Sequence, residues 1–320
     1  MENIMKSMES DVSSSSSSSA EYSKIHVFHN FSKEMLKEMF EVMRSEEASM
    51  QKERLETSTL PFAAIPTSIV QIIFHICEKL QQPMETRYLA VELYDRFVSN
   101  LFLAVAESIW PDMKVSLFDS EKWRTVSARL GEQSLLRVAT CVALASKFVS
   151  HDRKTSMKSI QQFLCNCGHP FSLKSIIASE MRIYKFLNYK LHFPSRQTHA
   201  QLLIEMVFLP ETIDKKLLQR LSYKVIDVTY LYHQEIFHKL FFYATGCWER
   251  TEDERRKFVG TELNNIYIAA AIVFTAFTFA YPTQSAISDQ LATNLDLITE
   301  IPSNDIISLS KIITMVVLQH

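Results

Sequence analysis

Glycine is scarce in this chain of 320 residues, where it occurs 4 times, and proline occurs 9 times. Such scarcity, with few runs of alternating β-branched residues, favours helices joined by short loops over strands and tight turns. So few glycines also exclude a glycine-rich loop that could cradle a nucleotide phosphate. The sequence therefore predicts an all-α protein without a nucleotide-binding motif.

An excess of charge of one sign is also lacking, since the formal net charge is −2. No overall basicity would recruit nucleic acid or anionic lipid. The stretch "HDRKTSMK" at 151–158 is a modest basic patch, too small to indicate DNA binding. We therefore expect neither direct nucleic-acid binding nor association with a membrane.

The five cysteines are odd in number, and the start "MENIMKSMES" has no apolar core typical of a secretory signal. This pattern predicts free thiols in a reducing compartment. "CNCGH" places Cys165, Cys167 and His169 close together, but zinc needs four ligands and no second pair is evident. We expect no metal, no cofactor and, because no nucleophile stands at a recognisable elbow, no enzymatic activity.

The N-terminal part of the chain divides into two segments. Residues 1–25 contain "SSSSSSS", which has nothing to bury, and are predicted to be disordered. Residues 26–60 are predicted to form a helical extension outside the main core. Their amphipathic stripe, opposite many charges, consists of Phe31, Met35, Met39, Val42 and Met43.

The remainder predicts two bundles of five helices each, over residues 61–194 and 195–320. In each, the third helix is apolar on all sides, at 137–149 and 266–280. The second of these is shorter than the roughly 20 residues of a bilayer span and is predicted to be a bundle helix. Periodicity also predicts one continuous helix from "KKLLQRLSYKV" to "HKLFFYA", residues 215–244.

Three stretches carry a resemblance to a known family. "ETRYLAVELYDRFVS" and "LLRVATCVALASKF" resemble the two signature helices of the cyclin box, and "SEMRIYKFLNYKLHFPS" resembles its fifth helix and exit. The insert before "LLRVATCVALASK" and the later "VIDVTYLYHQEIF" are most similar to the cyclin N-terminal domain-containing protein 1 subfamily. The resemblance implies tandem cyclin boxes, the first over about 67–195 and the second divergent.

By this resemblance, Lys147 matches the cyclin-box lysine and Glu180 the glutamate of the fifth helix, which in cyclins hold the small lobe of a kinase. A lysine can donate to unpaired carbonyls at a helix entrance, and a carboxylate can accept from orphan N–H groups. Taken alone, each is more often a solvated charge, the lysine favoured by the helix dipole. The apolar groove around them would consist of Leu144, Phe148, Tyr184, Tyr189 and Leu191.

The chain also departs from the family's pattern. Val149 and Ser150 follow the lysine and phenylalanine, where cyclins usually have acidic residues. In the first-helix patch that recruits substrates, Ile72 stands at the tryptophan position and His75 at an acidic one. Pro66 stands where the family has an arginine. These differences argue against substrate docking by the usual patch.

The resemblance implies a non-catalytic regulatory or scaffold subunit that promotes meiotic crossover formation. Its expected partners are a cyclin-dependent kinase and meiotic recombination proteins, and its expected location is the nucleus, at crossover sites on meiotic chromosomes. The alternative is a cyclin-fold nucleic-acid-binding or transcription-related factor, because cyclin boxes also occur in transcription initiation factors.

Overall fold

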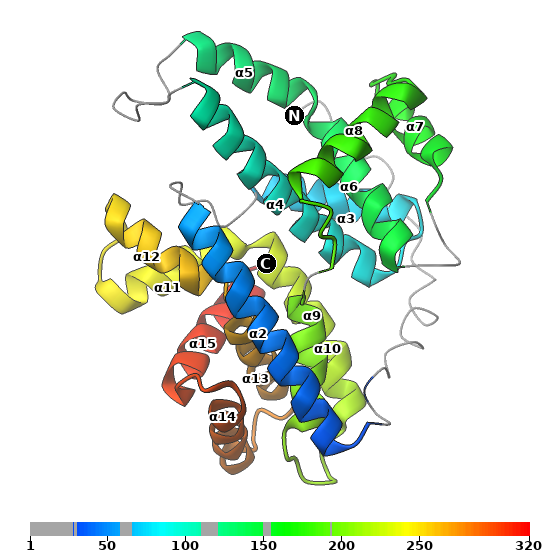
Figure 1. The fold of residues 1–320 in the computed structure, drawn as a ribbon. Coiled ribbons are helices and arrows are strands. Elements are labelled where there is room, and N and C mark those ends of the chain that lie inside the picture. Colours follow the sequence, from blue (N-terminus) through cyan, green and yellow to red (C-terminus); the bar gives the residue numbers. More distant parts are fainter. Residues whose placement is uncertain (1–27, 29–30, 58–65, 110–120, 150–154, 193) are drawn as a thin grey trace. The chain divides into compact units, whose positions relative to one another are not determined.

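The computed structural model describes residues 28, 31–57, 66–109, 121–149, 155–192 and 194–320. These residues form fourteen α-helices and no β-strand, which confirms the all-α prediction (Figure 1). The predicted disorder of residues 1–25 falls outside the described part of the chain.

The chain divides into two compact units. The first unit contains residues 73–97 and 106–189, and the second contains residues 27–72, 98–105 and 190–320. The chain thus passes from one unit to the other a few residues before the boundary that the sequence predicts at 194–195.

The first unit is built around α6 (Ser134–Val149), which packs against its neighbours α5, α7 and α8. Every residue of α6 from Leu135 to Ser146 is buried. Small side chains at Ala139 and Ala143 leave room for close approach of the surrounding helices. The central helix expected at 137–149 is confirmed. The bounds of the other helices with most of their length in this unit are Thr67–Lys79 (α3), Met84–Ile109 (α4), Glu121–Glu132 (α5), Met157–Asn166 (α7) and Leu173–Phe186 (α8).

Serine caps fix where α7 and α8 begin. The Ser156 side chain accepts a hydrogen bond from the Ser159 N–H at 3.0 Å, and Ser172 accepts one from the Ser175 N–H at 3.1 Å. Each cap satisfies a backbone donor that the first helical turn leaves unpaired. The start of α8 is therefore set locally, and with it the position of Glu180 two turns later.

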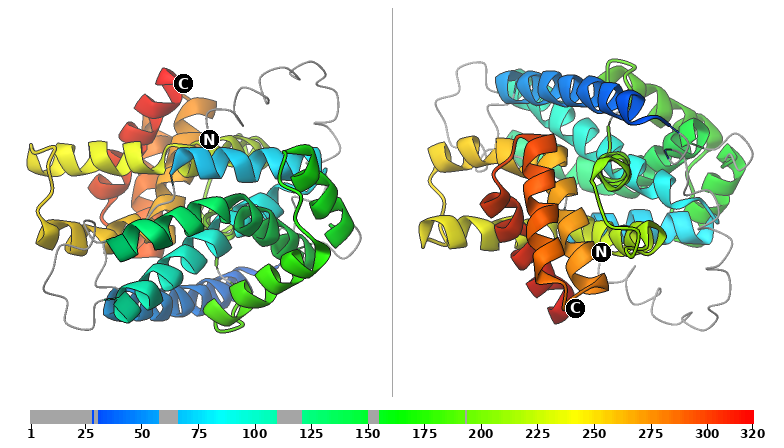
Figure 2. Two further views of the ribbon diagram at one scale, coloured as in Figure 1. Left: turned by 90° about the horizontal axis from the view of Figure 1, so that it is seen from above. Right: turned by 90° about the horizontal axis from the view of Figure 1, so that it is seen from below.

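The second unit is built around α13 (Asn265–Ala280), in which every residue from Asn265 to Phe277 is buried. It packs against α9, α10, α14 and α15, and Figure 2 shows the last helices of the chain (orange to red) gathered together. The central helix expected at 266–280 is thus confirmed. The bounds of the surrounding helices are Arg196–Met206 (α9), Lys215–Leu231 (α10), Ser285–Thr299 (α14) and Ser303–Gln319 (α15).

Over the described residues, no single helix has both the length and the apolar composition to cross a bilayer. Two bent pairs, α12 with α13 and α14 with α15, meet these criteria only when their two helices are taken together.

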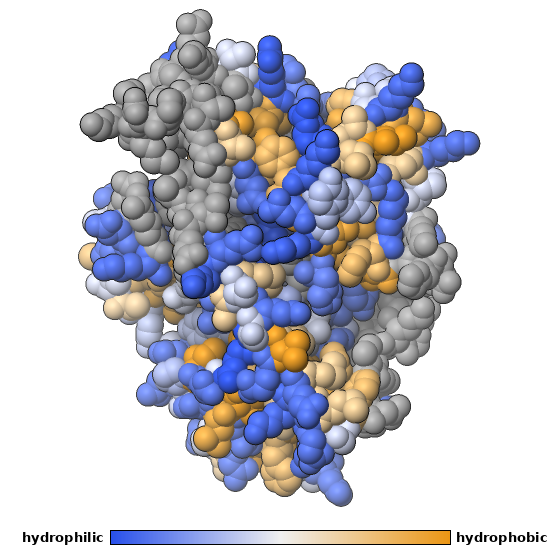
Figure 3. Space-filling view, in the orientation of Figure 1, coloured by the Kyte–Doolittle hydropathy of each residue, from blue (hydrophilic) through white to orange (hydrophobic). Residues whose placement is uncertain are grey.

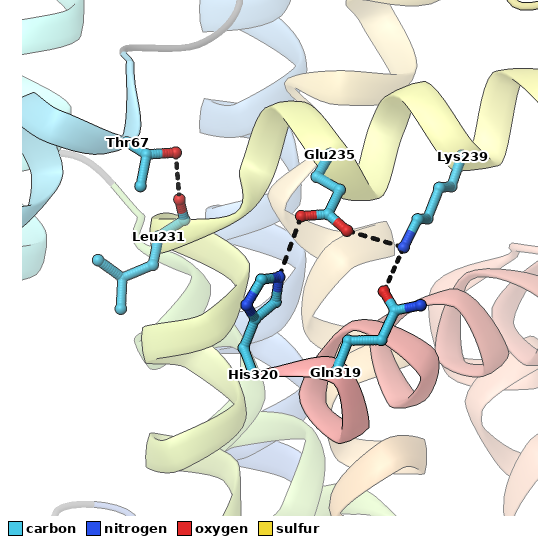
Figure 4. Close-up of polar contacts among 6 residues, drawn as sticks. All are labelled: Thr67, Leu231, Glu235, Lys239, Gln319 and His320. Atoms are coloured by element: carbon cyan, nitrogen blue, oxygen red, sulfur yellow. Dashed lines mark hydrogen bonds and ion pairs between the residues drawn. The ribbon is translucent and has the colours of Figure 1, made fainter.

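The continuous helix predicted for residues 215–244 is broken. Helix α10 ends at Leu231 and α11 (His233–Thr245) begins after Tyr232, followed by α12 (Glu252–Glu262). The Leu231 carbonyl near the break accepts a hydrogen bond from the Thr67 hydroxyl of α3 (Thr67–Lys79) at 2.7 Å (Figure 4). A side chain distant in sequence supplies this bond, so local periodicity could not predict the break.

Helix α11 is tied to the end of α15. Lys239 donates to Glu235 at 2.7 Å and to Gln319 at 2.6 Å, and the Nε2 atom of His320 lies 3.4 Å from Glu235 (Figure 4). The His320 ring also stacks on Tyr232, with centroids 4.1 Å apart. These contacts hold α11 against the end of α15. Helix α11 is thus an additional helix of the second bundle, inserted in the chain between α10 and α13.

The same kind of buried polar contact occurs within each unit, between α6 and α8 in the first and between α13 and α15 in the second. The hydroxyls of Thr140 and Ser179 are 3.0 Å apart in the first unit, and those of Thr275 and Ser310 are 2.8 Å apart in the second. Each threonine also bonds the carbonyl four residues before it. All four side chains are buried. The recurrence of one contact at matching helices indicates that the two bundles follow one helical plan.

The N-terminal helix α2 (Lys33–Thr57) corrects the sequence analysis, which placed it outside the main core. It packs against α9 and α12 and belongs to the second unit (Figure 1). Its buried residues are Leu36, Phe40 and Glu47. None of them belongs to the stripe that the sequence indicated, of which Met39 and Met43 are half-buried and the other three residues exposed. Burial of Leu36 and Phe40 stabilises the docked helix, and the partner surface lies too far along the chain for local patterning to reveal it.

Candidate partner-binding site

The predicted site residues Lys147 and Glu180 lie together in the first unit. Lys147 is in the last turn of α6, and its Nζ atom is 2.5 Å from Oε1 of Glu180 on α8, although the residues are 33 positions apart. The lysine side chain is 37% exposed and the glutamate 12%. The close packing of α6 and α8 therefore brings an acid and a base to one place at the rim of the bundle.

This ion pair contributes little to folding. A partly exposed pair is worth about 0.2–1 kcal/mol, because solvent screens it and both side chains lose freedom. The two groups nevertheless keep binding capacity, since an ammonium has three donors and a carboxylate can accept several hydrogen bonds. A partner's backbone can therefore bond to both while the pair persists.

The negative charge of Glu180 affects the ionisation of Tyr184, which lies one turn later on α8. Burial raises the pKa of the Tyr184 hydroxyl, and the carboxylate of Glu180 raises it further. A neutral phenol beside the ion pair presents a donor and an aromatic face to any partner at this surface.

A second tyrosine is held beside the first by an unusual backbone. Asn188 and Tyr189 both have left-handed conformations, with φ of 50° and 59°, just beyond the end of α8. The Tyr189 N–H donates to the Tyr184 carbonyl at 2.9 Å, and the two rings stack with centroids 6.3 Å apart. Such φ values are uncommon for aromatic residues. The tight turn fixes Tyr189, which is 64% exposed, next to Tyr184.

Two exposed apolar side chains of α8 extend this surface and were missed by the sequence analysis. Ile177 and Met181 are 51% and 47% exposed. With Glu180 and Tyr184 they follow the spacing i, i+3, i+4 and i+7, so all four lie on one face of the helix. That periodicity was the signal available in the sequence, beside the buried stripe through Ile176 and Ile183.

The comparisons with known proteins agree with this architecture. No family model matches the chain. Two curated proteins are similar to it, and both are named cyclin N-terminal domain-containing protein 1. The mouse protein is 25% identical over 249 residues, which is 76% of this chain and 72% of that protein. The human protein is 22% identical over 206 residues, or 64% and 62% of the two chains, so less than two thirds of it is matched.

These similarities support a cyclin-like family relationship. The relationship predicted from the signature stretches is confirmed, and the site at Lys147 lies in the unit that contains most of their residues.

One residue predicted to line the groove is misplaced. Leu144 is fully buried, so its side chain belongs to the core and does not line a surface groove. It lies almost one turn deeper in α6 than Lys147, where other helices enclose α6. A match to a family position does not tell how deeply the side chain is buried in this chain. Phe148, one position after Lys147, is 46% exposed as a groove residue should be.

Leu191 is half-buried and falls in the second unit, just beyond the end of the first. Its membership of the groove stays a prediction.

Among the described residues of the second unit, no counterpart of the ion pair is found between α13 and α15. Ser179 of the buried threonine–serine contact is followed by Glu180, whereas Ser310 is followed by Lys311. Helix α13 also contains no lysine. Of the two bundles, the first alone therefore combines an acid and a base at the position where the cyclin resemblance implies partner binding.

Proposed function

We propose that this cyclin-like protein is a non-catalytic subunit that binds a cyclin-dependent kinase through the first unit. The Lys147–Glu180 pair carries this proposal, because its position at the rim of α6 and α8 matches the cyclin resemblance. The lysine donates to carbonyls of the kinase's mobile small-lobe helix and its adjoining loop. The glutamate accepts from their unpaired N–H groups.

The apolar side chains around the pair receive the same helix. Phe148, Ile177, Met181 and Tyr189 are each about half exposed or more. Shifting a kinase from 1% to 99% active requires a preference for the active state of about 5.5 kcal/mol. Truncation of a well-placed anchor side chain costs about 2 kcal/mol, so loss of any one of these anchors should weaken binding measurably.

The subunit performs no chemistry in this proposal. By binding one state of the kinase helix more tightly, it increases the population of that state. A glutamate of the kinase helix then pairs with the lysine that contacts ATP, as phosphoryl transfer requires.

The capture of a purified cyclin-dependent kinase tests this proposal. We expect Lys147→Ala with Glu180→Ala to reduce kinase capture at least tenfold while the melting temperature changes by less than about 3 °C. The matched control is Glu235→Ala with Lys239→Ala, which removes a pair of similar exposure in the second unit and should leave capture unchanged. Equal capture by wild type and the Lys147/Glu180 variant would exclude a kinase site here.

We further propose that the protein acts in the nucleus, at crossover sites on meiotic chromosomes, where it helps designated recombination intermediates to mature. The support is the resemblance to the cyclin N-terminal domain-containing protein 1 subfamily, and recombination proteins are the expected partners. A null mutant should lose crossovers and show unpaired homologues at the end of prophase, with mitotic growth unaffected. Normal crossover numbers would refute the meiotic role. Salt-sensitive DNA binding by the purified protein would support the nucleic-acid-binding alternative.

A further inference from the structure

Helix α2 has a second apolar face that the second unit does not cover. Met35, Met39 and Val42 follow the spacing i, i+4 and i+7, and Phe31 stands at the entrance of the helix. Met35 and Val42 are 46% and 59% exposed, and Phe31 is 40% exposed. These four residues form the outer stripe of α2. An exposed apolar stripe on a charged helix is typical of a protein-interaction surface.

The other face of α2 is firmly held, so the outer stripe is not a core face that has turned outward. Phe40 is 1% exposed, and the carboxylate of Glu47 accepts a hydrogen bond from the backbone N–H of Asn265 at 2.8 Å. The Gln51 amide also donates to Glu47 and to the Leu263 carbonyl. These contacts fix the rotation of α2 about its axis.

The charges beside the outer stripe are acidic. Glu34, Glu38 and Glu41 follow one edge at i, i+4 and i+7, and Glu46 lies one turn beyond Val42; all four are exposed. At about 100° per residue, the three basic residues in the half of α2 that bears the stripe fall beyond this acidic row, away from the stripe. They are Lys33, Lys37 and Arg44; Lys52 and Arg54 come later, near the end of the helix. In the space-filling view, which has the orientation of Figure 1, hydrophobic patches (orange) interrupt a largely hydrophilic surface (blue) (Figure 3).

We propose that the outer stripe of α2 docks a basic amphipathic helix of another protein. Apolar residues of that helix would cover Met35 and Val42, and its lysines or arginines would pair with Glu34 and Glu38. A second copy of this chain fits less well, because its α2 would bring the same glutamates and no cation to the edge of the stripe. The surface belongs to the second unit and does not depend on kinase binding.

Binding of a synthetic peptide to the full chain tests this assignment. The probe is a fluorescently labelled helical peptide with leucines at i, i+4 and i+7 and lysines on both sides of them. The comparison peptide has glutamates in place of the lysines. We expect the basic peptide to bind wild type and the acidic peptide to bind at least tenfold more weakly, with the difference reduced at high salt.

Variants then locate the binding surface. Met35→Ser with Val42→Ser should weaken binding at least tenfold, and Glu34→Gln with Glu38→Gln several-fold, with a shallower salt dependence. Leu297→Ser is the matched control, because Leu297 is a 75% exposed apolar residue elsewhere in the same unit. It should bind as wild type does.

Three results would overturn the assignment. They are failure of the basic peptide to bind wild type, equal binding of the two peptides, and unchanged binding by the Met35/Val42 variant. Self-association of the chain that this same variant abolishes would also overturn it, since a second copy would then be the occupant.

Discussion

Truncation of Leu144 and truncation of Phe148 should have opposite consequences, although the two residues are one turn apart on α6. Leu144 is fully buried, and Leu→Ala changes at such sites cost about 2–5 kcal/mol, more where the surroundings cannot collapse. Helices enclose α6 around Leu144, so we expect about 3–4 kcal/mol. For a unit of this size, that lowers the melting temperature by about 10–15 °C.

Phe148→Ala should cost less than about 1 kcal/mol, because the ring is already 46% exposed. It should nevertheless weaken kinase capture, since Phe148 is an anchor of the proposed surface. Leu144→Met conserves volume, should cost less than about 1.5 kcal/mol and serves as the control for core packing.

The assay combines thermal melting with hydrogen exchange of the α6 amides, because two compact units need not unfold together. We expect Leu144→Ala to lower the protection of α6 and, at a temperature where it remains folded, to retain kinase capture. A melting temperature unchanged by Leu144→Ala would refute the assignment of this side chain to the core. If folded Leu144→Ala no longer captured the kinase, Leu144 would have to be counted among the groove residues after all.

Two further predictions concern the second unit. Burial lowers the pKa of His199 to about 4, so the unfolded state binds one more proton than the folded state between pH 6.5 and 4. The free energy of unfolding of this unit should therefore fall by up to about 3 kcal/mol as the pH falls through this window. Denaturant titrations of His199→Leu should show a free energy of unfolding that depends less on pH. Glu47→Ala should destabilise the same unit by about 1.5–3 kcal/mol, because it leaves the buried Asn265 N–H without this acceptor. Glu47→Gln keeps an acceptor and should recover part of the lost stability. An unchanged urea midpoint for Glu47→Ala would contradict the contact.

The central helices could be predicted from sequence because a stretch that is apolar on all sides has one stable environment in water, a bundle interior. The pairing of Lys147 with Glu180 could be anticipated because the cyclin resemblance places both residues. The docking of α2 could not, since Glu47 and its partner are 218 positions apart. The break at Tyr232 was hidden for a similar reason, because Thr67 supplies the hydrogen bond to the Leu231 carbonyl.

The attachment of α2 to the second unit has a consequence for how the chain folds during synthesis. The helix leaves the ribosome early, but the Asn265 N–H that it caps is made 218 residues later, roughly 10–40 s at ordinary elongation rates. Its apolar residues have no partner in the second unit until α9 has been made, and the first unit is synthesised before that. The helix must therefore remain exposed or be shielded by a chaperone until then. Deletion of α2 would destabilise the second unit, although most of that unit is encoded much later in the chain.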